Sequence, residues 1–516
     1  IAYAVVAAAP FLVAGMCAAG VLRGMVGAGR TRSILGVGHW SGPFRAWALG
    51  IVLPICSLGA LPVARELRRA GIPSGTVLSF VLVAPVLNPV SIIYGLSHIE
   101  PFTLVYFGAG TFVVSTGIGL IWNYCIAEKQ DVSPKNLEVA PRNSIQRIAV
   151  AADTAARGLI GPVFADYALA LLAVGFLGAF LPYGVMQTGM TRDNIFAPII
   201  MGLVAIPVYV TPTDVMMHFG QIVRDGYSLG AAFALIVLGA GANVGVANWL
   251  RRDYGSRPLM LFVGLLIGTT LIIGFTADRT MIHGKATMED HTHAFDAFTR
   301  LATVPAEDAG PAWVIAEVDA SIRRHEASAT AEVGGLILLT VMMAAGLVLH
   351  VSGDRFRVDH LLHPSADAGD KSSPAWNPAL TPRQLVAAIV VGVVALAVIG
   401  LYIFYPTPKD LLSEMSVIRV EAYDAVRTQD ITEFRRRTTQ WKRQIEKLPI
   451  SLRIRGESVT ETAEESLSEF FYALNTLDDY MATGRFAEAK MMKRYVEGLY
   501  RNCSEEFVPG GLQPIQ

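Results

Sequence analysis

A thiol and a hydroxyl lie at a break in an apolar segment near the start of the chain. Cys56 and Ser57 stand between Pro54 and Gly59 in a run that is otherwise apolar. A proline inside a helix removes a backbone donor and clashes with the preceding turn, so one continuous helix is excluded here. A thiol is a soft ligand, suited to thiophilic metals and trivalent arsenic. The pattern predicts a solute-binding turn, and a small cysteine packed in the core is the alternative.

Prolines and a glycine mark the predicted helix breaks, and they form two clusters along the chain. The breaks are assigned to Pro54, Gly59, Pro62, Pro85 and Pro89 in the first cluster and to Pro207 and Pro212 in the second. Non-helical backbone at membrane depth is tolerated only where protein buries it or where it lines a cavity. We therefore expect a solute pathway between the two broken segments, which cover residues 46–63 and 195–212.

Polar residues near these breaks are the candidate solute contacts. They are Cys56, Ser57, Asn88, Tyr209, Thr211 and Asn243. Asn88 and Asn243 are equally suited to cross-link packed helices, so both roles stay open. Asp214 is the candidate for proton coupling, because acids at membrane depth often belong to proton relays. The same side chain could instead cap a helix that begins at Val215.

The composition is that of an integral membrane protein. Of the 516 residues, 53% are hydrophobic and 16% are charged, and the mean hydropathy is +0.45. The net charge of −1 gives no indication of nucleic-acid binding. The four cysteines form no CxxC pair, so neither a disulfide framework nor a zinc site is expected, and no cofactor is predicted. The membrane segments contain no nucleophile–base arrangement, which argues against an enzyme.

Apolar and charged residues divide the chain into six parts. They are a first transmembrane repeat at 1–126, a cytoplasmic linker at 127–165, a second transmembrane repeat at 166–276, an external loop at 277–331, two further transmembrane helices with a cytoplasmic linker at 332–405, and a soluble helical domain at 406–516. The last part holds 34 of the 85 charged residues. Leu467, Phe470 and Leu474 follow helical spacing there, which predicts a bundle of about four helices punctuated at Pro449 and Gly456.

The two membrane parts resemble each other. A shift of 155 residues places the stretch from Gly75 to Asn88 on that from Gly230 to Asn243 without a gap. Seven arginines and one acid flank the first broken segment, whereas two arginines and three acids flank the second, which indicates opposite sides of the membrane. We therefore predict an all-α protein with two inverted repeats, each with a broken re-entrant segment. The topology would differ if the two stretches matched only by chance, or if segment 46–63 crossed the membrane fully.

The first broken segment also resembles a known signature. The run from Leu53 to Pro89 resembles that of the ArsP-type permease family, bacterial permeases that include organoarsenical exporters and relatives proposed to export soft metals. The matching residues are Pro54, Cys56, Ser57, Gly59, Pro62, Arg68, Arg69, Gly71, Pro85, Asn88 and Pro89. Members with a thiol pair have a second cysteine where this chain has Leu58. A single thiol binds trivalent arsenic or copper(I) less well than a pair, which leaves the substrate open.

The resemblance implies a multi-pass permease of the bacterial inner membrane. We expect efflux of a soft metal, a metalloid or an organoarsenical species by alternating access within the lipid bilayer. The alternative is a non-transporting membrane subunit whose external helical domain binds a partner or senses a ligand. A homo-oligomer or an external protein partner is compatible with either function, and no nucleic-acid partner is expected.

Overall fold

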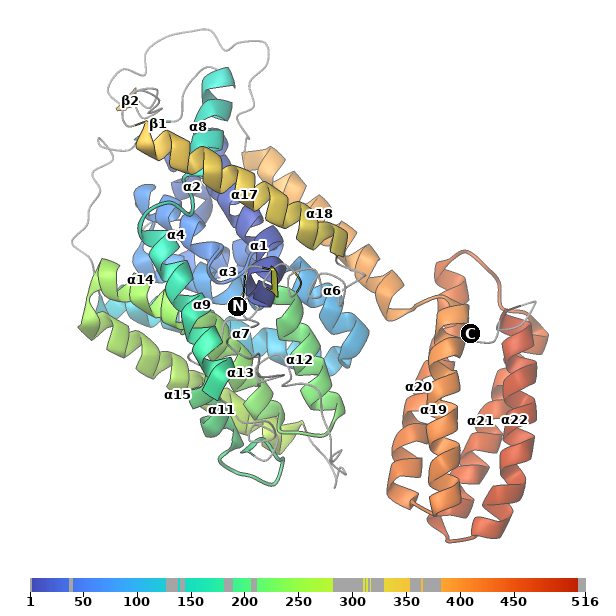
Figure 1. The fold of residues 1–516 in the computed structure, drawn as a ribbon. Helices are drawn as coiled ribbons and strands as arrows, with labels where there is room; N and C mark the ends of the chain where they lie inside the picture. The colour runs from blue at the N-terminus through green and yellow to red at the C-terminus, as the bar shows by residue number, and fades with distance from the viewer. Residues whose placement is uncertain are drawn as a thin grey trace. The chain divides into compact units, whose positions relative to one another are not determined.

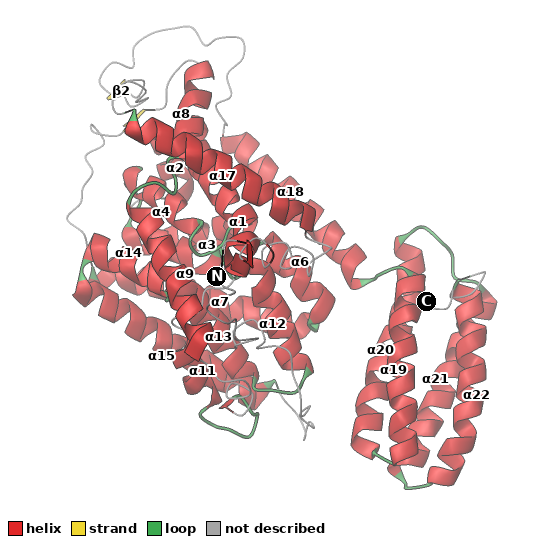
Figure 2. Cartoon of the chain, in the orientation of Figure 1, coloured by secondary structure: helices red, strands yellow, loops and turns green. Residues whose placement is uncertain are grey.

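The structure is a computed structural model, and it is almost entirely helical (Figure 1, Figure 2). It describes residues 2–36, 40–126, 138–139, 144–180, 189–205, 211–281, 310, 312–313, 316, 329–352, 363–364 and 382–508. Within these ranges the only strands are β1 Glu138–Val139 and β2 His363–Pro364, which form one antiparallel pair. The predicted all-α class is confirmed. The chain divides into two compact units, Ile1–Leu396 and Ala397–Gln516.

The first unit is built from apolar helices packed around one hydrophobic core. Its helices are α1 Ala2–Val21, α2 Ala28–Leu35, α3 Gly42–Val52, α4 Ala60–Arg69, α5 Ser74–Val83, α6 Pro89–His98, α7 Pro101–Cys125, α8 Ser144–Ala156, α9 Pro162–Phe180, α11 Ala197–Ala205, α12 Pro212–Arg224, α13 Leu229–Gly241, α14 Val244–Tyr254, α15 Ser256–Thr280, α17 Ala329–Val351 and most of α18 Pro382–Phe404. A π-helical turn, Leu22–Val26, continues α1.

Four described helices are long and apolar enough to cross a membrane. They cover Ala4–Val26, Pro101–Cys125, Ser256–Thr280 and Ala331–Val351. Helices α13 and α14 meet the same criterion together, although they are bent by 47° at the break between them. Apolar side chains such as Phe102, Leu203 and Ile272 are exposed on these and neighbouring helices, as expected of surfaces that face lipid.

The order of helices α3 to α7 recurs in α11 to α15. In both sets the first helix packs against the third, and the third packs against the fifth. Gly71 and Gly226 occupy the same place in the two sets, just before the third helix, with φ of 74° and 81°. Such positive φ values favour glycine, which lacks a Cβ. The recurrence supports a duplicated unit, and the opposite orientation of its copies in a membrane stays a prediction.

One hydrogen bond occurs in both sets at matching positions. The Gly75 N–H at the start of α5 donates to Asn123 Oδ1 over 2.8 Å. The Gly230 N–H at the start of α13 donates to Asp278 Oδ1 over 2.9 Å. Each bond satisfies a free amide at a helix N-terminus with a side chain from the fifth helix of its set. The matched pairs differ in charge, because an amide in one set is a carboxylate in the other.

The same glycines bring two helix backbones into direct contact. A Cβ added at Gly75 would overlap the carbonyl oxygen of Gly119, and one added at Gly230 would overlap that of Gly274. Real Cβ atoms do not approach backbone oxygens so closely, so a larger residue would push the third helix away from the fifth. Helix spacing in both sets therefore depends on these glycines.

Two apolar stretches, residues 75–97 and 229–249, are each divided between two helices, α5 with α6 and α13 with α14. Asn88 is the N-cap of α6, and its side chain accepts from the backbone N–H groups of the first turn. Asn243 holds the same position before α14. Asparagine breaks these segments because its side chain bonds to nearby backbone in a non-helical conformation. Pro89 follows at the first position of α6, where a missing N–H costs nothing.

Other predicted breaks shift by a few residues. Pro62 lies in the first turn of α4 rather than in the break, since proline is tolerated there. Helix α12 begins at Pro212, three residues before the predicted start at Val215, which puts Asp214 inside the first turn and not at the cap. Pro207 lies outside the described residues, as does most of the predicted external loop.

Helix α17 is held closely against α1 and α8. A Cβ added at Gly335 would lie 2.7 Å from the backbone nitrogen of Pro10 in α1. A Cβ added at Gly346 would overlap the carbonyl oxygen of Ala156 in α8. Arg157 donates from Nη2 to the carbonyl of Leu349 over 3.1 Å, which satisfies one free acceptor at the end of α17. This helix is therefore part of the first unit's core.

The second unit contains a four-helix bundle, as predicted. Its helices are α19 Pro408–Thr428, α20 Ile431–Ile454, α21 Glu461–Ala482 and α22 Phe486–Phe507 (Figure 1). The buried Trp441 packs against the rings of Tyr423, Phe470 and Tyr500, with ring centroids between 5.4 and 6.0 Å away. A second hydrophobic core forms around this contact.

Only one of the two breaks predicted inside the bundle exists. Gly456 follows Arg455, the C-cap of α20, and has φ of 79°. Pro449 instead lies inside α20. The prediction at Pro449 is wrong because the buried side chains of Leu448 and Leu452 keep the helix on the bundle core despite one lost backbone bond.

We expect Gly75→Ala and Gly230→Ala to destabilise the membrane unit by about 1–3 kcal/mol each, because both introduce a Cβ into a backbone contact. Gly264→Ala in α15 is the matched control, since an added Cβ there meets no atom within 4 Å. Unfolding of the purified chain in detergent, followed by circular dichroism, measures the difference. Equal midpoints for the three variants would contradict the packing argument.

Candidate functional site

The turn between α3 and α4 lies inside the apolar core. Cys56 and Ser57 are both completely buried. The Gly59 N–H donates to Cys56 Sγ over 3.3 Å, and the Ala60 N–H donates to the Cys56 carbonyl over 2.9 Å. The turn therefore folds back on the thiol and satisfies its own backbone groups, as a break in an apolar environment requires.

Helix α1 closes one side of this turn without leaving space for a side chain. A Cβ added at Gly15 in α1 would overlap the carbonyl oxygen of Gly59. A Cβ added at Gly59 would lie 2.8 Å from the carbonyl oxygen of Phe11 and 3.3 Å from the Cys56 sulfur. The position of the thiol therefore depends on close contact between two backbones.

The first unit has two corresponding halves, helices α3 to α7 and helices α11 to α15. The second half contacts the Cys56 turn through Asn243. Its side-chain nitrogen donates to Ser57 Oγ over 3.1 Å and to the carbonyls of Gly239 and Ala240, each over 3.2 Å. Its side-chain oxygen accepts from the Val246 N–H over 3.1 Å. Asn243 thus caps α14 and also joins the bend of the second half to the turn of the first.

Asn88 and the second break form a separate region of the unit. Asn88 is buried, and its described bonds are local: it donates to the Ala84 carbonyl and accepts from the N–H groups of Val90 and Ser91. Thr211 is buried directly before α12. Helix α12 packs against α6, so these parts of the two halves also meet. Of the other predicted contacts, Tyr209 lies outside the described residues, and only the helix backbone is described at Pro212 and Asp214.

The structure adds a buried ion pair that sequence reasoning missed. Asp166 at the start of α9 is fully buried, and Arg252 in α14 donates to both its carboxylate oxygens over 2.9 Å. Asn248 donates to the same carboxylate over 2.7 Å. A bidentate pair of this kind fixes two helices in register. A single acid among apolar residues was the available signal, because ionisable residues at membrane depth are commonly functional.

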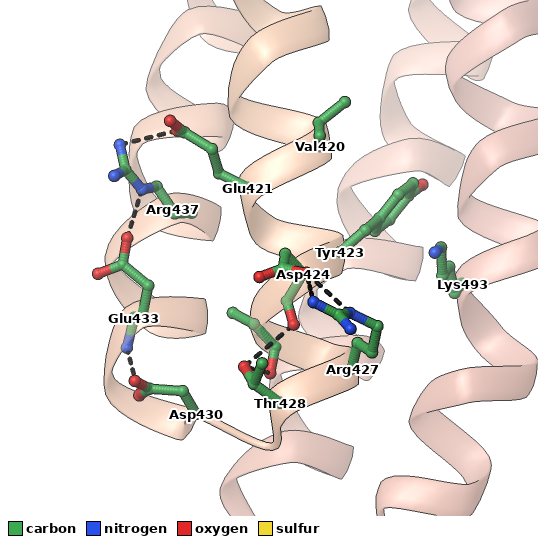
Figure 3. Close-up of a pocket in the computed structure, with 11 residues that line it drawn as sticks. Val420, Glu421, Tyr423, Asp424, Arg427, Thr428, Asp430, Glu433, Arg437 and Lys493 are labelled. Carbon is green, nitrogen blue, oxygen red and sulfur yellow. Dashed lines mark hydrogen bonds and ion pairs between the residues drawn. The ribbon is translucent and has the colours of Figure 1, made fainter.

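The C-terminal bundle carries a groove of about 660 Å³ that is lined mainly by charged and polar residues (Figure 3). Its lining residues come from α19, α20 and α22: Val420, Glu421, Tyr423, Asp424, Ala425, Arg427, Thr428, Asp430, Glu433, Arg437 and Lys493. Arg427 pairs with Asp424 over 2.6 Å, and Arg437 pairs with Glu421 over 2.9 Å. Most of the charge in the groove is therefore balanced within the protein, which is typical of a solvated face.

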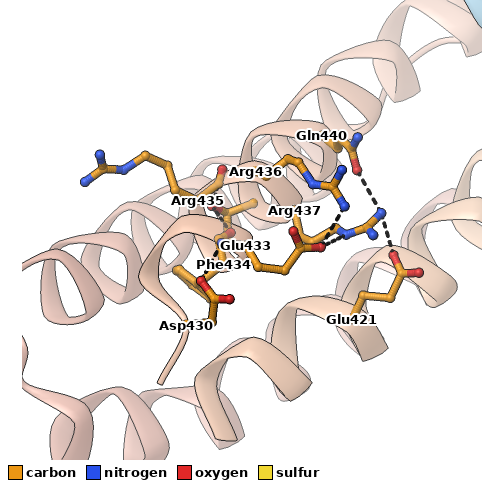
Figure 4. Close-up of polar contacts among 9 residues, drawn as sticks. Glu421, Asp430, Glu433, Phe434, Arg435, Arg436, Arg437 and Gln440 are labelled. Carbon is orange, nitrogen blue, oxygen red and sulfur yellow. Dashed lines mark hydrogen bonds and ion pairs between the residues drawn. The ribbon is translucent and has the colours of Figure 1, made fainter. Parts of the chain in front are cut away.

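Glu433 is the centre of a small charge network beside this groove (Figure 4). It accepts from Arg436 over 2.9 Å and from Arg437 over 2.6 Å. Partial burial alone would raise the pKa of Glu433, but the hydrogen bonds and charges of the two arginines outweigh burial and hold that pKa below its ordinary value.

Comparison with known proteins identifies a family for the N-terminal part of the chain. Residues 1–278, more than half of the chain, match the family ArsP_1, which is described as a predicted permease. The chain belongs to this predicted permease family. A relative in the same family, the UPF0718 protein YcgR of Bacillus subtilis (strain 168), is 21% identical over 294 residues, which are 54% of this chain and 93% of YcgR. No solved structure matches the chain.

The family match and the membrane-length helices together identify a multi-pass membrane transporter, consistent with the bacterial inner membrane. The matched residues include the Cys56 turn, the Asp166 ion pair and both bends at Asn88 and Asn243. Helix α17 and the C-terminal bundle lie beyond residue 278 and are therefore additions to the part that matches the family.

We expect Ser57→Ala and Asn243→Ala to be energetically coupled by about 0.5–1.5 kcal/mol, because each removes one side of the same hydrogen bond. The readout is a double-mutant cycle of unfolding in detergent. The matched control combines Ser57→Ala with Asn88→Ala, whose effects should add, since the described bonds of Asn88 are local. Equal coupling in both cycles would contradict the contact between the halves.

We expect Glu433→Gln to reduce the acid sensitivity of the bundle. A lowered pKa contributes stability above the unfolded-state value, about 4.5, and this stability is lost as the pH falls through the folded-state value. Urea unfolding of a fragment of residues 406–516 between pH 7 and pH 3 measures it. The difference should stay below about 1 kcal/mol, because the network is partly exposed. Glu469→Gln, at an exposed glutamate of α21, is the control, and an equal effect there would contradict the role of the network.

Proposed function

We propose that this ArsP_1 family protein exports a thiophilic solute, namely a soft metal, a metalloid or an organoarsenical species. The observation that carries the proposal is the Cys56 turn, a fully buried thiol in non-helical backbone where the two halves of the unit meet. A thiol selects soft centres over hard cations. The thiol keeps its proton until such a centre binds, and binding releases that proton. The buried site therefore holds no unpaired thiolate before the solute arrives.

Alternating access is the proposed mechanism, and the recurrence of α3 to α7 in α11 to α15 supports it. In transporters with inverted repeats, one repeat rocks against the other around a site at their interface. The contact of Ser57 with Asn243 and the packing of α6 on α12 join the two halves and support this proposal. Thr211 and Tyr209 complete the proposed pathway at the second break, and Asp214 in α12 is the proposed residue for proton coupling.

The side chain that replaces a second thiol has a packing role. Leu58 is fully buried, and its Cδ2 would lie 2.8 Å from a Cβ added at Gly245 in α14. The position after Ser57 therefore contacts the second half of the unit. A solute bound to Cys56 must complete its coordination with groups other than a neighbouring cysteine of this turn.

We expect Cys56→Ala to abolish any gain in tolerance that the protein gives to cells exposed to trivalent organoarsenicals, copper or zinc, because the variant lacks the soft ligand. Cys125→Ala is the matched control, since Cys125 is an exposed cysteine at the end of α7. Uptake of the same solutes by inside-out vesicles measures transport directly. Unchanged tolerance and flux in Cys56→Ala would remove the thiol from the mechanism.

A further inference from the structure

A single thiol leaves most of the coordination of a soft solute unfilled, and helix α9 offers one further polar group nearby. Tyr167 is 6% exposed, and its hydroxyl has no hydrogen-bond partner among the residues that the structure describes. A buried hydroxyl without a partner is destabilising, because it has lost its hydrogen bonds to water. Such groups are rare enough in folded proteins that each one requires a physical explanation.

Helix α9 reaches the Cys56 turn beside Gly245. A Cβ added at Gly245 would lie 2.6 Å from the Asp166 carbonyl, 2.8 Å from Leu58 Cδ2 and 3.2 Å from Ala170 Cβ. Asp166 and Ala170 of α9 and Leu58 of the turn therefore all pack against Gly245 of α14. Among the described residues, Cys56 is the one ionisable group whose charge acts on the Tyr167 hydroxyl.

The position of Tyr167 is fixed by its neighbour in the sequence. Asp166 is held by both Nη atoms of Arg252 and by the side chain of Asn248. These bonds set the register of α9 against α14, and Asn243, at the start of α14, donates to Ser57. Tyr167 therefore lies on a helix that is fixed to α14, which in turn is joined to the Cys56 turn.

We propose that Tyr167 is a solute-binding residue whose hydroxyl donates a hydrogen bond to an oxygen on the solute that Cys56 holds. The inference rests on the proposed function, because it takes Cys56 as the soft ligand. It narrows the solute to a thiophilic centre that carries at least two hydroxyl groups, such as a hydrated trivalent metalloid, in preference to a bare soft cation.

The binding step balances without a redox partner. The S–H bond of Cys56 and one bond between the metalloid and a hydroxyl break, while a sulfur–metalloid bond forms. The thiol proton and the departing hydroxide leave as water, and the oxidation state of the metalloid does not change. The second hydroxyl stays on the solute and accepts the hydrogen bond from Tyr167, which satisfies the buried phenol.

The test compares two soft probes that differ in oxygen. The full-length chain is purified with Cys17, Cys125 and Cys503 replaced by alanine, so that Cys56 is its only thiol. Phenylarsine oxide, which hydrates to carry two hydroxyls, and methylmercury chloride, which carries none, are each loaded on the protein. Glutathione then competes for the probe, and the concentration that removes half of it is measured by elemental analysis.

We expect Tyr167→Phe to lower that glutathione concentration about 2- to 10-fold for phenylarsine oxide, the effect of one hydrogen bond, and to leave methylmercury unchanged. Tyr106→Phe is the matched control, because its hydroxyl donates to the Ile273 carbonyl over 3.2 Å and should affect neither probe.

Three outcomes would overturn the inference. Equal retention of phenylarsine oxide by Tyr167→Phe and the parent would show that the hydroxyl makes no contact with the solute. Equal loss of both probes would assign Tyr167 to packing around the thiol. Failure of both probes to bind the parent would contradict the proposed function itself, and the role of Tyr167 with it. The first two results leave the proposed function in place.

Discussion

The polar backbone of the Cys56 turn must be satisfied inside an apolar body, and much of the membrane unit is arranged around that requirement. Lipid offers no hydrogen bonds, so a break in a helix needs partners from the protein. The Ala60 N–H and the Cys56 sulfur provide partners within the turn, and α1 covers it at Gly15. Asn243 adds the only described side-chain bond to Ser57 from the other half. The turn is therefore held by its own hydrogen bonds, by the backbone of α1 and by Asn243 of the second half.

Corresponding polar residues of the two halves make different contacts or differ in charge. Asn88 and Asn243 cap corresponding helices, but only Asn243 has a described bond to the opposite half. Asn123 and Asp278 likewise support corresponding helix starts, one as an amide and one as a carboxylate. A duplicated unit, as predicted, would explain the shared positions, and the proposed solute site would lie where the two copies differ.

Local signals account for what the sequence could predict. Proline chemistry locates the break at Pro54, and helical periodicity predicts the C-terminal bundle with its buried face at Phe470. Pro449 misleads because tertiary packing keeps its helix intact. The pairing of Asp166 with Arg252 is not readable from sequence, because 86 residues separate partners that only the fold brings together. Tyr167 is hidden for the same reason, since its value as a ligand depends on what surrounds it.

Helix α17 is synthesised long after the helix that it packs against. It packs on α1 at Pro10, and α1 in turn supports the Cys56 turn at Gly15, yet Gly335 is translated more than 300 residues after Pro10. At about 5–20 residues per second, roughly 15 to 65 s pass between the two. During that interval the membrane or the insertion machinery must cover the face of α1 that α17 later occupies. Helix α1 and the Cys56 turn are thus synthesised early, and the helix that packs against α1 is added much later.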